Sequence, residues 1–200
     1  MIKILIAVPT FENICPETFK SIYDLKKPKN CRVDFRYIRG YDCARARNEI
    51  VNLVKKSNYD YVLMVDSDVI LPENALVCLM EDSPNVVVGA YPRKRDPSKS
   101  EVFGIEKADY SDENRLQIDF LKKYMCNRIE IRGAGAGCLL IKASIFDELK
   151  YPYFKYVVYN AKGSFLSEDL YFCEAVRKLN YKIYVDTRVI CKHVGRKIVG

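Results

Sequence analysis

The chain has 200 residues, of which 49% are apolar and 30% charged, and its formal net charge is +7. This balance excludes both a disordered tail and a membrane protein, because the longest uncharged apolar runs are strand-sized and far shorter than the ~20 residues that span a bilayer. The eight cysteines contain no CxxC pair, which excludes the usual zinc cage and predicts reduced thiols in a cytoplasmic protein.

The first ninety residues alternate between strand-like and helix-like patterns. The predicted strands are Ile2 to Val8, Cys31 to Ile38, Tyr59 to Val65 and Val86 to Ala90. The predicted helices open at Pro16 and end before Pro28, run from an Asp42 N-cap to Lys56, and run from Pro72 to Glu81. Alternation of this kind predicts a parallel sheet with helices on both faces.

The pattern changes after Pro92. Short alternating segments follow at Glu101 to Lys107, Arg115 to Leu121 and Arg128 to Arg132, and then a strand at Cys138 to Ile141 and a helix at Ala143 to Leu149. An aromatic loop at 151–159 precedes a helix from Ser167 to Leu179 and two closing strands at Tyr181 to Val185 and Val189 to Cys191. We therefore predict one domain over 1–200, with a mixed second half and a mobile tail over 195–200.

Two carboxylates stand one residue apart at the end of the third strand, in Asp66-Ser67-Asp68. The carboxyl ends of parallel strands are where open α/β sheets bind ligands. Such a pair can hold Mg²⁺ or Mn²⁺ and leave coordination positions for substrate phosphates. The alternative is that Asp66 and Asp68 only cap the turn before the helix at Pro72.

Two further features carry chemistry late in the chain. In Ser167-Glu168-Asp169 the serine suits a helix N-cap and the acids suit the first turn, while a carboxylate there could also serve as a general base. His193 is the only histidine, and it lies in a basic, glycine-containing tail. It is either structural or a ligand of a metal held by the two aspartates.

Three other features have open alternatives. Arg45 and Arg47 oppose the dipole at the start of their helix, so they either grip phosphate or belong to the charged surface. The alternating Gly and Ala at 133–137 join strand to strand, which indicates close approach of backbone to a ligand or a neighbouring element. The basic clusters at 93–99 and 192–197 fit a phosphate-bearing small ligand, an anionic surface or a polynucleotide.

Taken in chain order, these residues resemble the GT-A glycosyltransferases, most closely the family-two-like nucleotide-sugar transferases. The resemblance covers almost the whole chain. It rests on six motifs, which are Ala7-Val8-Pro9-Thr10, Ala46-Arg47-Asn48, Asp66-Ser67-Asp68, Gly135-Ala136-Gly137, Ser167-Glu168-Asp169 and His193. It implies a GT-A type, Rossmann-like α/β fold with a mostly parallel sheet flanked by helices, a nucleotide-binding half at 1–92, and an acceptor- and metal-completing half at 93–194.

The resemblance also implies a role for each motif. A nucleotide-diphosphate sugar of UDP or GDP type would lie against Pro9, Thr10, Asp34, Arg47, Asn48, Asp66, Ser67, Gly135 and Ala136. The metal, Mn²⁺ or Mg²⁺, would be held by Asp68, Asp66 and His193. Asp169, with Glu168 beside it, would deprotonate the acceptor hydroxyl in a direct displacement that inverts the anomeric carbon.

Two other functions stay open, and the partners are only partly defined. A nucleotidyltransferase of related fold would want a Gly-rich loop after the first strand, and 8–13 contain no glycine. A non-catalytic nucleotide- or nucleic-acid-binding module would use the basic clusters and the aromatic loop; of these ligands we expect nucleic acid least. The acceptor, whether carbohydrate, lipid or protein, is not defined. We expect a cytoplasmic location without a transmembrane segment, and the basic clusters leave room for peripheral binding to a membrane surface.

Overall fold

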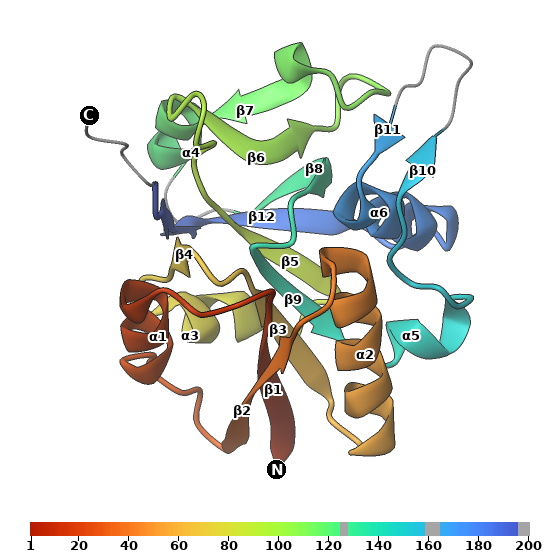
Figure 1. Cartoon of the computed structure of the whole chain (residues 1–200). Helices are drawn as coiled ribbons and strands as arrows, with labels where there is room; N and C mark the ends of the chain where they lie inside the picture. Colours follow the sequence, from red (N-terminus) through yellow and green to blue (C-terminus); the bar gives the residue numbers. More distant parts are fainter. Residues whose placement is uncertain (125–127, 159–164, 196–200) are drawn as a thin grey trace.

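The computed structural model describes residues 1–124, 128–158 and 165–195, and these build one large mixed sheet. Its nine strands lie in the order β2-β1-β3-β9-β5-β12-β8-β6-β7 (Figure 1). Their bounds, in that order, are Cys31–Arg39, Ile2–Thr10, Tyr61–Val65, Cys138–Lys142, Val86–Ala90, Ile183–Ile190, Arg128–Ala134, Lys99–Gly104 and Arg115–Gln117. Two small sheets pair β4 (Val69–Ile70) with β13 (Lys192–His193) and β10 (Val157–Val158) with β11 (Phe165–Leu166).

Helices cover both faces of the sheet and enclose two apolar cores. Helices α1 (Pro16–Tyr23) and α3 (Ala75–Met80) pack on one face. Helices α2 (Cys43–Lys56), α4 (Ile118–Lys123), α5 (Ile145–Glu148) and α6 (Glu168–Lys178) pack on the other. The central strands β1, β3 and β5 contribute to both cores, which explains their nearly continuous apolar sequence.

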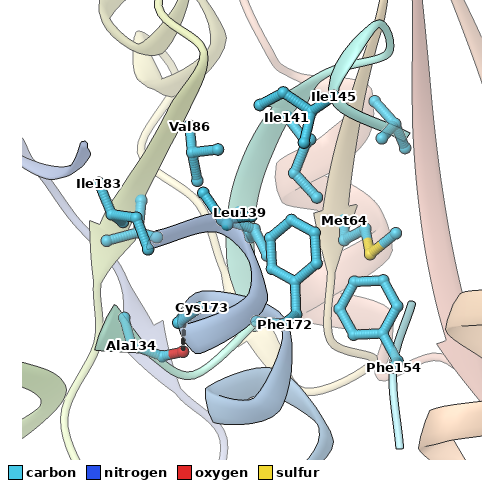
Figure 2. Close-up of a cluster of buried hydrophobic side chains, with 14 of the residues drawn as sticks. Met64, Val86, Ala134, Leu139, Ile141, Ile145, Phe154, Phe172, Cys173 and Ile183 are labelled. Carbon is cyan, nitrogen blue, oxygen red and sulfur yellow. Dashed lines mark hydrogen bonds between the residues drawn. The ribbon is translucent and has the colours of Figure 1, made fainter. Parts of the chain in front are cut away.

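The core under α5 and α6 is built around stacked aromatic rings (Figure 2). Phe154 and Phe172 stack with their ring centroids 4.7 Å apart and an interplanar angle of 13°. Met64 and Leu139 reach the same cluster from β3 and β9. The Cys173 thiol points to the carbonyl of Ala134, at 3.7 Å. This packing anchors the first turn of α6, which carries the candidate base, to the centre of the sheet.

The structure confirms the α/β class with helices around a central sheet, and it corrects the details of the second half. The sheet is mixed, because β9, β8 and β7 run against their neighbours and only the pairs β1–β2, β1–β3 and β5–β12 are parallel. Parallel neighbours need long crossovers, usually helical, and beyond Pro92 the short links favour antiparallel pairing.

Three predicted elements differ from those in the structure, and the predictions for the residues outside the described ranges stay untested. The segment predicted as extended at 115–121 is a short strand followed by helix α4. The two predicted closing strands are one strand, β12, with an irregularity between Asp186 and Ile190. The helix predicted at 72–81 begins only at Ala75. Of the tail predicted at 195–200, residues 196–200 lie outside the described residues, as does the end of the aromatic loop at 159. Across the ranges that are described, no helix is long and apolar enough to cross a membrane.

Candidate functional site

The parallel strands β1 and β3 end at one edge of the sheet, and a cavity lies there. Its volume is about 300 Å³. It is lined by Pro9, Thr10, Phe11, Tyr41, Asp42, Cys43, Asp66, Ser67 and Asp68. The chain therefore brings together the ends of β1 and β3 and the start of α2, where Asp42 caps the helix by accepting a hydrogen bond from the Arg45 amide at 3.0 Å. This position is the one expected for a ligand in an open α/β sheet.

The carboxylate of Asp68 lies between two cationic groups. Lys94, from the basic loop after β5, donates a hydrogen bond to Oδ2, and His193 Nε2 lies 3.3 Å from Oδ1. Pairing of β13 with β4 and a 2.8 Å bond from the Val194 amide to the Asp68 carbonyl hold His193 in place. Burial alone would raise the pKa of Asp68, but the hydrogen bonds from His193 and Lys94 outweigh it and lower that pKa to about 2.

The second ring nitrogen of His193 is also held. Nδ1 lies 2.9 Å from the carbonyl of Pro92, and because a carbonyl only accepts, Nδ1 carries a hydrogen. The hydrogen bond to Asp68 places a hydrogen on Nε2 as well, so the ring is charged when both contacts are made. When the ring loses the Nε2 proton, the lone pair on that nitrogen faces Asp68. Burial lowers the pKa of His193, while Asp68 and the Pro92 carbonyl raise it, and the net shift is upward. One imidazole nitrogen and one carboxylate, oriented in this way, fit a Mn²⁺ or Mg²⁺ ion.

Asp66, the third predicted metal ligand, faces a different partner. Its Oδ1 accepts a 2.6 Å bond from Arg47, which is 2% exposed and also ion-paired with Glu168. Among the described residues there is accordingly no group of three side chains that could hold a metal. In this structure Arg47 joins the end of β3 to the start of α6, and its predicted contact with the donor stays a prediction. Its Nε is buried without a hydrogen-bond partner.

The two adjacent acids of α6 have different surroundings. Glu168 is buried, and burial raises its pKa although Arg47 opposes the shift. Asp169 is half-buried and accepts hydrogen bonds from the Ser167 hydroxyl and from the Leu170 amide at 2.8 Å. Ser167 has the extended backbone of an N-cap, but its side chain bonds Asp169 and caps no amide. Both acids lie within electrostatic reach of Asp66.

The Gly-Ala run approaches a neighbouring element, Tyr91, and not the cavity. A Cβ added at Gly135 would lie 2.2 Å from the Tyr91 hydroxyl oxygen, and one at Gly137 would lie 2.7 Å from its ring. Tyr91 accepts a 3.1 Å bond from the Gly137 amide and meets His193 edge to face. Gly135 and Ala136 are buried and do not line this cavity, and the donor contact predicted for them stays a prediction.

Two other predicted donor contacts lie elsewhere. Asp34 pairs with Leu5 on β1, which is four residues before Pro9 at the cavity, or about 13 Å at ~3.3 Å per residue. Its carboxylate accepts a 2.9 Å hydrogen bond from the Tyr59 hydroxyl. The amide group of Asn48 bonds the Phe154 carbonyl at 2.7 Å and the Tyr153 amide at 2.9 Å. In this structure Asn48 is therefore a buried anchor for the aromatic loop, and its predicted contact with the donor stays a prediction.

The sequence analysis did not single out several residues that line the cavity. Tyr41 and Cys43 follow the carboxyl end of the second predicted strand, and this position was the available signal for them. Arg45 lies over the Tyr41 ring, 4.2 Å from its centroid, which explains a cation at the start of a helix. Lys94 was noted only as part of a basic cluster, because its partner Asp68 is 26 residues away in the sequence.

Comparisons with known proteins give a fold and no family. No protein-family model and no curated protein sequence matches the chain.

Among solved structures, A197 from STIV superposes with a TM-score of 0.67 at 17% identity, over 98% of this chain and 87% of that one. GalNAc-T7, crystallised with UDP, GalNAc and Mn²⁺, superposes with a TM-score of 0.59 at 12% identity. The match covers 96% of this chain and 44% of GalNAc-T7, so the chain spans less than half of that protein's length. The chain has a glycosyltransferase-like fold.

Proposed function

We propose that the protein is a glycosyltransferase that moves a sugar from a nucleotide-diphosphate donor to an acceptor hydroxyl. The observation that carries this proposal is the cavity at the ends of β1 and β3, which is lined by Asp68, the partner of His193 and Lys94, within a glycosyltransferase-like fold. Pro9, Thr10 and Ser67 line the same cavity and are proposed to contact the donor. The ring of Tyr41, which also lines it, is proposed to contact the nucleobase of the donor.

A divalent cation fits this site with Asp68 and His193 as its two protein ligands. The remaining positions suit the oxygens of a diphosphate and water, since Mg²⁺ and Mn²⁺ commonly bind nucleotides with few protein ligands. When bound, the ion would neutralise negative charge on the departing diphosphate. Lys94 is proposed to add a second positive charge at the same place, because its ammonium group already lies against Asp68.

Asp169 is proposed as the general base. It is half-buried, and the Ser167 and Leu170 hydrogen bonds fix its carboxylate. In the transfer, Asp169 takes the proton of the acceptor hydroxyl while that oxygen forms a bond to the anomeric carbon and the bond to the diphosphate breaks. Attack from the face opposite the diphosphate inverts the configuration. Glu168 and Asp66, joined through Arg47, position this turn of α6 against the end of β3.

The test is a thermal-shift panel of UDP, GDP, CDP, dTDP and ADP, each with and without Mn²⁺. A ligand that binds only the folded state, at ~100 times its dissociation constant, adds about 2.7 kcal/mol to the free energy of unfolding, or roughly 5 to 10 °C in Tm at this size. We expect one nucleotide to give a Mn²⁺-dependent shift that Asp68→Asn removes. No shift with any nucleotide, or a shift with single-stranded DNA alone, would favour the binding module.

A further inference from the structure

An aromatic pair stands exposed at the end of the molecule that carries the candidate base. Tyr156 and Phe165 stack with centroids 5.3 Å apart and an interplanar angle of 16°, and they are 44% and 58% exposed. Tyr156 directly precedes β10, and Phe165 begins β11, the strand that leads into α6 (Figure 1). Burying aromatic surface is a main driving force of folding, so two stacked rings left open to solvent beside the β10–β11 pair are a surface available to a ligand.

This pair is tied to the candidate active site through one residue. Tyr156 lies within interaction range of the carboxylate of Glu168, the buried acid that is ion-paired with Arg47. Asp169, the proposed base, is the next residue of α6. Cys43, which lines the cavity, is close enough to interact electrostatically with both Tyr156 and Asp169. Because Phe165 lies only four residues before Asp169 in the chain, a molecule resting on the two rings would lie beside the first turn of α6.

The chemistry of the surroundings favours a neutral sugar as the occupant. A pyranose ring has C–H groups on its faces, which pack on aromatic rings, and hydroxyls around its rim, which bond to carboxylates. Phe165 leads into the first turn of α6, where Glu168 and Asp169 lie within electrostatic reach of Asp66, and this group of carboxylates disfavours a polyanion such as a nucleic acid. A flat apolar face beside acidic hydrogen-bond acceptors suits a polyhydroxylated ring.

We propose that Tyr156 and Phe165 form the acceptor subsite, and that the acceptor presents a pyranose ring which stacks on them and directs one hydroxyl to Asp169. This rests on the proposed function, because it assigns the other substrate of the same reaction. The acceptor class is then a carbohydrate, or a lipid or protein already carrying a sugar.

The chain contains no tryptophan, which gives a direct test. A Phe165→Trp variant places the only tryptophan on the aromatic pair. Phe120→Trp is the matched control, because Phe120 is also an exposed phenylalanine beside a tyrosine, with its centroid 4.8 Å from that of Tyr124, and it does not line the cavity. The probes are methyl pyranosides of glucose, galactose, mannose, N-acetylglucosamine and N-acetylgalactosamine up to about 100 mM, with glycerol and a single-stranded oligonucleotide as comparison ligands.

We expect at least one methyl pyranoside to change the emission of the Phe165→Trp variant saturably, glycerol to change nothing, and the Phe120→Trp variant not to respond. Adding Tyr156→Ala to the Phe165→Trp variant should weaken that binding about tenfold. The proposal is overturned if no pyranoside changes the emission, if both reporters respond equally, or if only the oligonucleotide acts. The nucleotide panel on the wild-type chain tests the proposed function separately, so the two failures are distinguishable.

Discussion

At the scale of single residues, the site depends on which partner each charged group has. Asp66 and Asp68 are one residue apart, yet Asp66 faces Arg47 and Asp68 faces Lys94 and His193. Sequence reasoning could place both carboxylates at the end of a strand, because that follows from the apolar run before them. It could not divide their roles, because the partners come from α2, the loop after β5 and the end of the chain.

Lys94 holds the position against Asp68 that a divalent cation would share. Removing its charge should therefore strengthen Mn²⁺ binding by the nucleotide-free protein. We expect Lys94→Met to lower the Mn²⁺ dissociation constant on the order of tenfold, measured by the electron paramagnetic resonance signal of free Mn²⁺. Lys99→Met is the control, since Lys99 pairs with Asp112 and not with Asp68. Equal affinities in Lys94→Met and wild type would show that Lys94 and the metal do not compete.

His193 is expected to matter for metal and not for folding. It is held by the Pro92 carbonyl and lies beside Asp68, but it belongs to a two-residue strand at the end of the described chain. Because His193→Ala removes one of the two protein ligands, it should raise the dissociation constant of Mn²⁺-dependent nucleotide binding at least tenfold. It should leave the metal-free Tm nearly unchanged. A large fall in the metal-free Tm would assign His193 a structural role instead.

At the scale of elements, the aromatic loop is attached to α2 through one buried amide. Asn48 accepts hydrogen bonds from the Tyr153 and Phe154 amides and donates to the carbonyls of Ala44 and Phe154. Asn48→Ala leaves buried backbone groups unpaired, so we expect it to lower the free energy of unfolding by about 2 to 4 kcal/mol in urea denaturation. Asn52→Ala, on the same helix and exposed, should cost less than about 0.5 kcal/mol. Equal costs would contradict the anchoring role.

The elements also show what local patterns determine. Strands β1, β3, β5 and β9 and helix α2 were predictable nearly to their ends, since continuous apolar runs and the Asp42 cap are local signals. The insertion of β9 between β3 and β5, antiparallel to both, was not. Strand order depends on contacts between distant segments, and a sequence of alternating strands and helices favours the parallel arrangement that the first half has.

At the scale of the whole molecule, one cluster of charged groups links strands β12 and β8 to helix α3. Asp186 is fully buried and bonds Arg188 at 2.6 Å and Arg128 at 3.3 Å, while Arg128 also bonds the carbonyls that end α3. Burial alone would raise the pKa of Asp186, but the hydrogen bonds and charges of the two arginines leave it below its usual value. A carboxyl whose pKa is lowered by folding stabilises the protein above its unfolded pKa, near 4, and this stabilisation is lost as the pH falls through the folded value.

The pH dependence of the unfolding free energy tests the role of Asp186. We expect Asp186→Asn to lower the free energy of unfolding at pH 7 by about 1.5 to 3 kcal/mol, because the amide removes the charge-assisted hydrogen bonds that two half-buried arginines donate to a buried carboxylate. Below about pH 4, the unfolding free energy of the variant should fall less steeply than that of wild type, by up to ~1.4 kcal/mol per pH unit. Urea denaturation between pH 7 and pH 2.5 measures both. Parallel pH profiles would exclude a lowered pKa for Asp186.

The central claim, transfer of a sugar with Asp169 as base, is tested most directly by release of nucleoside diphosphate from the sugar nucleotide that matches the binding nucleotide, with water as acceptor. We expect Asp169→Asn to bind the donor and Mn²⁺ with unchanged affinity and to release diphosphate about 10² to 10⁴ times more slowly than wild type. If Asp169→Asn turns over as fast as wild type, Asp169 is not the base. If the wild-type protein binds nucleotide but releases no diphosphate from any sugar nucleotide, with either water or the methyl pyranosides as acceptor, the proposed transfer is contradicted.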